Sequence, residues 1–137
     1  MTHRLTYVSR AGDLQHLREI LETSRVRNAE AGITGALCLL DGVYMQCLEG
    51  KLPALQEAYR RIARDTRHGD LRLLKLEAVQ RRYFEHWSLA LLTWTDETRA
   101  MYEFFMPEGE HDLYDIDADK ASTLLRTLSQ SKNWLAA

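Results

Sequence analysis

The sequence predicts an α+β fold, in which an antiparallel sheet is covered by helices. Short runs of β-forming residues alternate with stretches whose apolar residues recur at helical spacing, and an Asp-Gly pair joins two neighbouring apolar runs. With 137 residues, 45% of them hydrophobic and 28% charged, the chain has the size and composition of one globular domain. No linker composition and no internal repeat indicates a second domain.

A strand and a helix are expected at the start of the chain. Residues 4–9 form a short run of β-formers, which predicts the first strand. Asp13 is placed as a helix N-cap, because its carboxylate can accept from free backbone N–H groups of the first turn. Apolar residues then recur every three or four positions, so we expect a helix from about Leu14 to the neighbourhood of Arg27.

The next two apolar runs predict a β-hairpin. Residues 33–40 and 43–48 are both too short for typical helices, and Asp41-Gly42 lies between them. An Asp-Gly pair in this setting is the strongest short-range hairpin signal, because both central residues of a type I′ turn need positive φ. Strands two and three are therefore expected to be antiparallel neighbours.

A second helix and two further strands complete the predicted sheet. Pro53 stands where a helix can begin, and an apolar stripe at helical spacing follows it. Residues 71–79 predict a fourth strand and residues 87–94 a fifth. The first six elements thus run β-α-β-β-α-β, the ferredoxin-like arrangement of an antiparallel sheet backed by two helices.

The chain is expected to divide into a core, residues 1–95, and a C-terminal helical extension of the same domain, residues 96–137. Thr95-Asp96 can cap one helix, residues 107–117 read as an acidic loop, and a last helix follows. That helix presents Leu124, Leu125 and Leu128. The extension most simply covers the sheet face that the first two helices leave bare. An apolar tail used for oligomerisation is the competing interpretation.

Charge and cysteine content narrow the functional classes. A net charge of −2 and a pI near 6.2 carry no electrostatic signature of nucleic-acid binding. Cys38 and Cys47 lie inside apolar runs, which fits a reducing cytoplasm. No apolar run approaches the roughly 18 residues of a membrane span. The five histidines show no metal-ligand spacing, and no phosphate-binding glycine motif is present. We expect a cytoplasmic protein without membrane, nucleic-acid or metal partners.

Three polar residues need an explanation beyond core packing. Gln46 lies in the middle of an apolar strand, and a buried amide without partners costs about 1–3 kcal/mol, although a surface-facing position would also account for it. Tyr7 is a strand residue that taken alone is most simply a core aromatic. Asn28 falls near the end of the first helix, where Asn is common for conformational reasons.

The fold order brings these three residues together. The strands that carry Tyr7 and Gln46 are neighbours at the centre of a ferredoxin-like sheet, and Asn28 can lean over the same region. Such a convergence between two helices suits a flat heteroaromatic ligand with polar edges and apolar faces. A nearby basic run is typical of a solvated helix face, or alternatively holds a ligand phosphate or ring carbonyl. It comprises Arg60, Arg61, Arg64, Arg67 and His68.

Several blocks of the sequence resemble the blue-light-using-flavin (BLUF) family, in its order and spacing, over residues 4 to about 94. Residues 28–37 are similar to the family's Asn-x-x-x-Gly-Ile-Thr-Gly-x-Leu block, and residues 42–50 to its Gly-x-Phe-x-Gln-x-Leu-Glu-Gly block. The first strand and two further blocks, residues 64–68 and 81–88, match as well.

The resemblance implies a noncovalent flavin, usually FAD with FMN or riboflavin as alternatives, held between the two helices over the sheet. It implies that Ile20 and Ile62 pack on the two faces of the isoalloxazine, and that Asn28 bonds its pyrimidine edge near C4=O and N3. The residues that would serve the opposite edge are Asp65, Arg67 and His68.

The resemblance also implies photochemistry without substrate turnover, so we expect no enzyme activity. Under blue light Tyr7 would donate an electron and a proton, and the Gln46 amide would rearrange so that its hydrogen bond to C4=O strengthens. A Trp-x-Met pair commonly relays the signal in the family. Trp87 matches here, but Leu89 replaces the methionine and lacks its weak thioether acceptor.

The expected output is a conformational signal. With about forty residues after the fifth strand, we expect a short stand-alone sensor that signals to a separate effector protein or through a homo-oligomer of the tail. Two alternatives stay open. One is a ferredoxin-like flavoprotein with redox activity in the dark, and the other is an interaction module that binds no ligand.

Overall fold

The fold is taken from a computed structural model, which describes residues 1–106 and 112–135. The first six regular elements, with a short 3-10 turn ahead of the first helix, are a ferredoxin-like β-α-β-β-α-β unit, so the predicted α+β class and core order are confirmed. The elements are β1 (Thr2–Ala11), η1 (Leu14–His16), α1 (Leu17–Ala31), β2 (Thr34–Leu40), β3 (Val43–Lys51), α2 (Leu52–Arg64), β4 (His68–Val79), β5 (Ala90–Leu92), α3 (Asp96–Phe105), η2 (Leu113–Asp115), α4 (Ala118–Ser129) and β6 (Trp134–Leu135).

The strands form one sheet in the order β4-β1-β3-β2-β5-β6. Strand β1 runs antiparallel to both β3 and β4, whereas β5 runs parallel to β2. The predicted hairpin joins β2 to β3, with φ of 49° at Asp41 and 77° at Gly42, so both turn residues have the positive φ that a type I′ turn needs.

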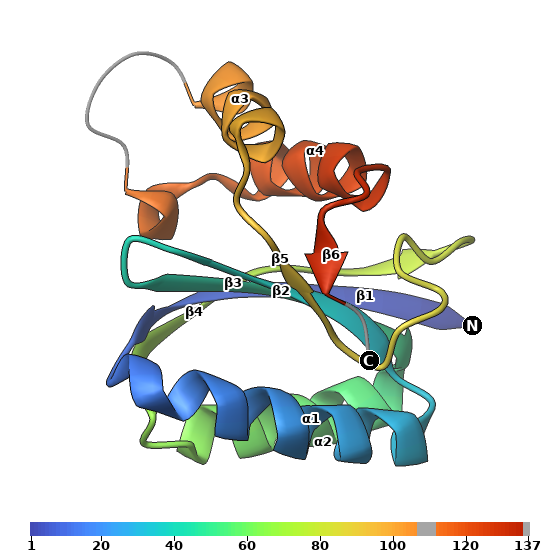
Figure 1. Cartoon of the computed structure of the whole chain (residues 1–137). Helices are drawn as coiled ribbons and strands as arrows, with labels where there is room; N and C mark the ends of the chain where they lie inside the picture. The colour runs from blue at the N-terminus through green and yellow to red at the C-terminus, as the bar shows by residue number, and fades with distance from the viewer. Residues whose placement is uncertain (107–111, 136–137) are drawn as a thin grey trace.

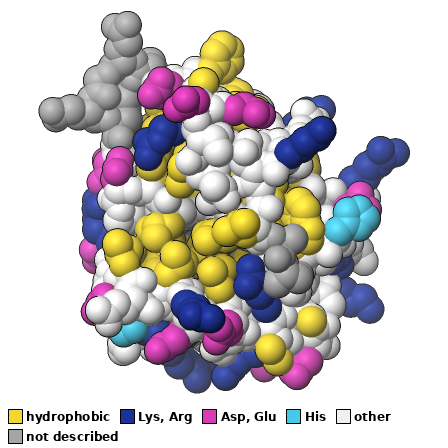
Figure 2. All heavy atoms as spheres, viewed as in Figure 1, with side chains coloured by type: hydrophobic (Ala, Val, Ile, Leu, Met, Phe, Trp, Pro, Cys, Tyr) yellow, Lys and Arg dark blue, Asp and Glu magenta, His cyan; other side chains and the backbone are white. Residues whose placement is uncertain are grey.

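Helices cover both faces of the sheet (Figure 1). Helices α1 and α2 lie side by side under one face, and α3 and α4 lie over the other. Leu124 and Leu125 of α4 are fully buried in one cluster with Val8 and Met45 of the sheet. Seen from the side, apolar side chains gather across the middle of the molecule at the level of the sheet (Figure 2). The C-terminal helices thus cover the sheet face opposite α1 and α2.

The fifth strand is shorter than the predicted residues 87–94. Only Ala90–Leu92 form β5, paired with β2 through Ala36 and Leu37. The residues just before it are not part of that ladder, although one backbone hydrogen bond still links them to β2. The Trp87 carbonyl accepts from the Gly35 N–H at 3.0 Å, and the next two carbonyls accept from side chains of α1.

Two other boundaries differ from the prediction. Helix α1 extends beyond Arg27 to Ala31 and ends at Gly32, whose φ of 69° is the left-handed cap conformation that glycine favours. Strand β4 begins at His68 instead of Leu71. A short strand that the sequence did not predict, β6, adds to the free edge of β5. The part of the acidic loop at residues 107–111 lies outside the described residues.

Two kinds of feature were sought among the described residues, a membrane-spanning helix and a cluster of metal ligands. None of the helices within residues 1–106 and 112–135 is long and apolar enough to cross a membrane. Over the same residues, no group of three or more His, Cys, Asp or Glu side chains is placed to hold a metal ion.

Candidate functional site

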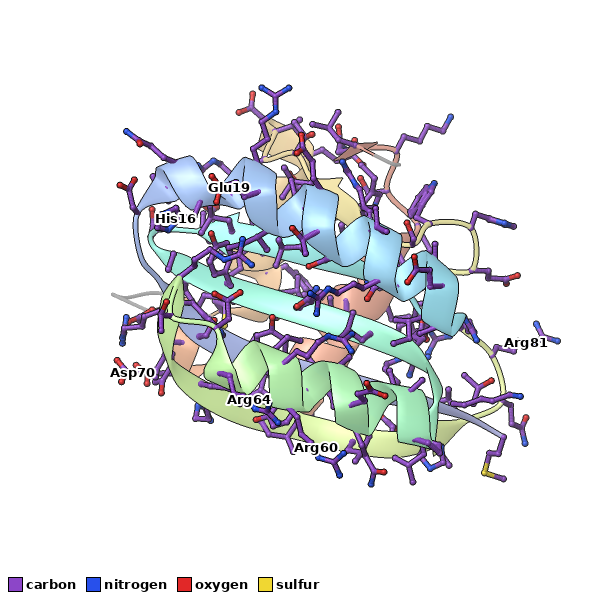
Figure 3. The ribbon with its side chains drawn as sticks, turned by 90° about the horizontal axis from the view of Figure 1, so that it is seen from below. His16, Glu19, Arg60, Arg64, Asp70 and Arg81 are labelled. Atoms are coloured by element: carbon purple, nitrogen blue, oxygen red, sulfur yellow. The ribbon has the colours of Figure 1, made fainter. Side chains whose placement is uncertain are left out.

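A cleft runs between α1 and α2 over the centre of the sheet. Its outer part is a cavity of about 320 Å³, and an inner part of about 40 Å³ lies deeper, beside β1 and β3. Ser24, Gln46, Ile62 and Asp65 line both parts, so the two volumes adjoin. Figure 3 looks onto the two helices that form the walls, with Glu19 labelled on α1 and Arg64 on α2.

Tyr7 and Gln46 meet on the floor of the cleft, as their strand positions predict. They are direct register partners on β1 and β3, and both side chains are buried. The Tyr7 hydroxyl donates a hydrogen bond to Oε1 of Gln46. Burial, with the nearby negative charge of Asp65 as a smaller cause, raises the pKa of Tyr7 far above its usual range. The phenol is therefore a neutral donor at physiological pH.

Tyr44 is a further tyrosine at the cleft that sequence reasoning missed. It lies two residues before Gln46 on β3 and lines the inner cavity, with 3% of its surface exposed. Its hydroxyl is buried and has no hydrogen-bond partner among the described residues. The sequence does carry a signal, because Tyr44 occupies the position of the Phe in the family block quoted above.

Asn28 lies inside α1, three residues before its end, and not at the helix terminus that the sequence suggested. The side chain is buried and lines the outer cavity. Its Nδ2 donates to the carbonyl oxygen of Ser88 at 2.8 Å. Asn28 therefore touches both the cleft and the segment that leads into β5, a connection that local sequence could not indicate.

Asp65 and Arg67 form a compact pair at the C-terminal end of α2. Arg67 Nε and Nη2 donate to the Asp65 carboxylate at 2.9 Å and 2.7 Å, and its backbone N–H donates as well. These hydrogen bonds hold the pKa of Asp65 below its usual value and raise that of Arg67. Oε2 of Glu19 on α1 lies 3.9 Å from Nη1 of Arg67 across the cleft. Both members of the pair line the outer cavity, as the resemblance implied for residues near the ligand edge.

His68 closes the inner end of the cleft. Its Nε2 lies 2.6 Å from the Ile62 carbonyl oxygen and its Nδ1 lies 2.8 Å from Ser9 Oγ. Because a carbonyl only accepts, Nε2 donates to Ile62, while Nδ1 forms the hydrogen bond with the Ser9 hydroxyl. These bonds fix the ring beside Tyr7, with ring centroids 6.4 Å apart.

Apolar and basic side chains complete the walls. Ile20 from α1 and Ile62 from α2 line the inner cavity from opposite sides. Of the basic run at the end of α2 and just after it, Arg61, Arg64 and Arg67 line the outer cavity, whereas Arg60 does not. Arg27 also lines the outer cavity, although no role was predicted for it from the sequence. With four arginines and one carboxylate, the outer cavity is positively charged and suits an anionic group.

Trp87 and Leu89 lie on opposite sides of the sheet. Leu89 is fully buried in a cluster with Leu37 and Tyr44, on the cleft side. Trp87 packs with the C-terminal helices, and its ring centroid is 6.2 Å from that of Trp134. Both residues precede β5 and do not lie within it, in contrast to the prediction. The segment therefore joins the cleft to the tail.

A buried ion pair beside this segment escaped the sequence-based reasoning. Glu49 is 0% exposed, and its carboxylate accepts from Arg4 Nε at 2.9 Å and from the backbone N–H groups of Tyr83 and Phe84. The Arg4 guanidinium also lies 3.4 Å from the centroid of the Tyr83 ring. A glutamate within the apolar run of β3 is the signal that could have revealed it. These contacts tie the chain after β4 to the sheet.

The cleft has the features that a flat heteroaromatic ligand needs. Apolar residues stand on its two walls, the Gln46 amide and the Tyr7 phenol lie on its floor, and the buried Tyr44 hydroxyl is left without a partner among the residues described. Arginines line the outer cavity, where a phosphate-bearing tail would be matched in charge. The donor set therefore fits a flavin nucleotide.

Comparisons with known proteins agree with this fit. A family model described as BLUF, sensors of blue-light using FAD, matches residues 2–90. The photoactivated adenylate cyclase subunit beta of Euglena gracilis is 36% identical over 107 residues, which cover 75% of this chain and 12% of that protein. The chain thus spans about an eighth of the length of that cyclase subunit.

Solved structures resemble the whole described fold. BlsA in its photo-activated state superposes with a TM-score of 0.87 at 25% identity, over 97% of this chain and 98% of BlsA. The dark-state structure of BlrB, a BLUF protein, has a TM-score of 0.78 at 28% identity, over 93% of each chain. Both similarities extend beyond the ferredoxin-like core into the C-terminal elements.

Proposed function

This chain belongs to the BLUF family of blue-light sensors that use FAD, and from that premise we propose that the cleft between α1 and α2 is its photoreceptor site. The observation that carries the proposal is the hydrogen bond from Tyr7 to Gln46 on the floor of a cleft with apolar walls. A flavin bound there supplies the absorption of blue light and an oxidising excited state.

Different residues around the cleft would contact the faces and the edges of the flavin ring. Ile20 and Ile62 hold the two faces of the ring, because they stand on opposite walls of the inner cavity. Asn28 serves one polar edge of the ring. The residues that serve the opposite edge are Asp65, Arg67 and His68. FAD is the family's flavin, and FMN and riboflavin share the ring that these residues would hold.

Tyr7 and Gln46 carry the photochemistry in this proposal. Tyr7 would give an electron to the bound flavin, and its hydroxyl already donates a hydrogen bond to Gln46 Oε1, along which the phenol proton could leave together with the electron. Transfer of that proton removes the donor that holds the amide in place. Gln46 then rearranges, by rotation or tautomerisation, and this change of a hydrogen-bond network is the switch.

The signal leaves through the segment before β5. Asn28 donates to the Ser88 carbonyl, so a shift of the Asn28 side chain moves the chain between Trp87 and Leu89. Trp87 contacts Trp134 on the other face of the sheet, next to α4. We infer that the domain turns over no substrate itself and that its output is read in the cytoplasm by a separate effector protein, or by a homo-oligomer built on the tail.

An absorption spectrum taken before and after blue light tests the proposal. Purified protein supplied with FAD should show flavin bands that shift slightly to the red on illumination and recover in the dark. Tyr7→Phe and Gln46→Leu should each abolish the shift while flavin stays bound. A protein that takes up no flavin would refute the site. Bound flavin without a reversible shift would refute the photoreceptor role, and rapid bleaching by NAD(P)H would point to dark redox activity instead.

A further inference from the structure

The Tyr44 hydroxyl is a polar group that the folded chain leaves unsatisfied. It is buried on the floor of the inner cavity, and no described residue donates to it or accepts from it. Burying an unpaired hydroxyl lowers stability, so native proteins rarely keep one without a use. A phenylalanine would fill the same space without this cost.

The polar neighbours of Tyr44 in the inner cavity are already engaged. Gln46 Oε1 accepts from Tyr7, and both ring nitrogens of His68 are used. Both carboxylate oxygens of Asp65 accept from Arg67. Each of these groups is therefore already hydrogen-bonded, and none of the bonds involves Tyr44; half-buried Ser24 on α1 also lines the cavity and forms no bond to Tyr44 among the described residues.

The position of Tyr44 on β3 aims it at the same ligand as Gln46. Side chains at i and i+2 of a strand point to the same face, about 7 Å apart. Tyr44 also lies close enough to Asp65 and Arg67 to feel both charges, and burial raises its pKa, so the phenol stays protonated. It can therefore donate a hydrogen bond at the side of the cleft where Asp65 and Arg67 lie.

We propose that Tyr44 is a further ligand-binding residue of this cleft, whose hydroxyl donates a hydrogen bond to an acceptor on the heteroaromatic ring of the flavin. The inference rests on the proposed flavin site and adds a specific contact to it. The proposal predicts opposite effects on flavin binding and on the stability of the flavin-free protein. Removing the hydroxyl should weaken flavin binding without weakening the flavin-free fold, because the fold itself gains nothing from that group.

Tyr44→Phe tests this, with Tyr59→Phe as the matched control. Tyr59 is a half-buried tyrosine of α2 that packs edge-on against Tyr7 but does not line either cavity. Riboflavin is titrated into flavin-free protein by fluorescence quenching, which isolates the ring from any phosphate contact. Tyr44→Phe should raise the dissociation constant about 3- to 10-fold, the range expected for one hydrogen bond. Tyr59→Phe should leave it unchanged.

Two further measurements separate the possible outcomes. The unfolding temperature of flavin-free Tyr44→Phe should equal or exceed that of the wild type, and its flavin absorption maximum in the dark should move. Equal riboflavin affinity of wild type and Tyr44→Phe would overturn the assignment alone. A lower unfolding temperature would overturn it too, because the hydroxyl would then serve the fold. A wild type that binds no riboflavin, FMN or FAD would instead overturn the proposed flavin site, and this inference with it.

Discussion

Replacing Glu49 with alanine should strongly destabilise the fold, because its fully buried carboxylate is the centre of a hydrogen-bond network. It accepts from Arg4 Nε and from the backbone N–H groups of Tyr83 and Phe84, at 2.8–2.9 Å. Arg4 is itself only 5% exposed. In the Glu49→Ala variant a buried guanidinium loses its counter-charge and two backbone donors lose their acceptor.

The magnitude follows from those three losses. Breaking a buried ion pair by removing one partner costs about 3–5 kcal/mol. Each orphaned backbone donor adds about 1–3 kcal/mol where water cannot reach it. Since these contributions overlap, we expect about 4 kcal/mol or more for Glu49→Ala. That is a large part of a total stability of roughly 5–15 kcal/mol, and it corresponds to a fall in unfolding temperature of about 10 °C or more.

The chain offers a matched control in Glu22, which pairs with Arg18 of α1. The Arg18–Glu22 distance is 3.2 Å, close to the 2.9 Å of the buried pair, but the two side chains are 89% and 65% exposed. Glu22→Ala should therefore cost less than about 0.5 kcal/mol. Urea unfolding of the two variants would measure the difference. A Glu49→Ala variant within about 1 kcal/mol of the wild type would refute the reasoning.

Three further predictions concern the cleft and its surroundings. Arg64→Gln removes a charge from the outer cavity, so it should weaken binding of FMN and FAD but not of riboflavin. Arg60→Gln on the same helix is the control and should change the affinity for none of the three flavins. Equal losses of FMN and FAD affinity in the two variants would contradict this prediction. Leu89→Met conserves volume, so unfolding temperature and flavin spectrum should stay nearly unchanged while dark recovery, followed by absorption, alters. Arg67 lowers the pKa of Asp65, so the Asp65 carboxylate stabilises the fold above its unfolded pKa of about 3.9, and this stabilisation is lost as the pH falls through the lower pKa of the folded state. Below about pH 4 the urea midpoint of Asp65→Asn should therefore decline less than that of the wild type.

Local signals were enough to predict the helices, most strands and the order of the core. Asp41-Gly42 specified a hairpin because the turn depends on φ at two adjacent residues, and both have positive φ in the structure. Pro53 and Thr95 stand at or next to the starts of α2 and α3, as expected of helix-start residues. Tyr7 and Gln46 were correctly placed face to face, since strand order alone determines that β1 and β3 are neighbours.

Nonlocal pairing decided the rest. The predicted fifth strand lost its first residues because Asn28 and Arg25, about sixty positions away, take the carbonyls of Ser88 and Leu89. Whether Glu49 is an exposed charge or a buried anchor depends on where Arg4 lies, and sequence distance carries no information about that.

In the cleft, too, some features followed from the sequence and others depended on nonlocal contacts. Its three polar residues could be identified from the sequence, because each interrupts an apolar pattern or falls in a family block. The unsatisfied hydroxyl of Tyr44 could not, because a tyrosine on a strand looks the same whether its hydroxyl is paired or not. Only the tertiary structure, by bringing β1, β3 and both helices together and engaging the other acceptors, decides which polar group is left for the ligand.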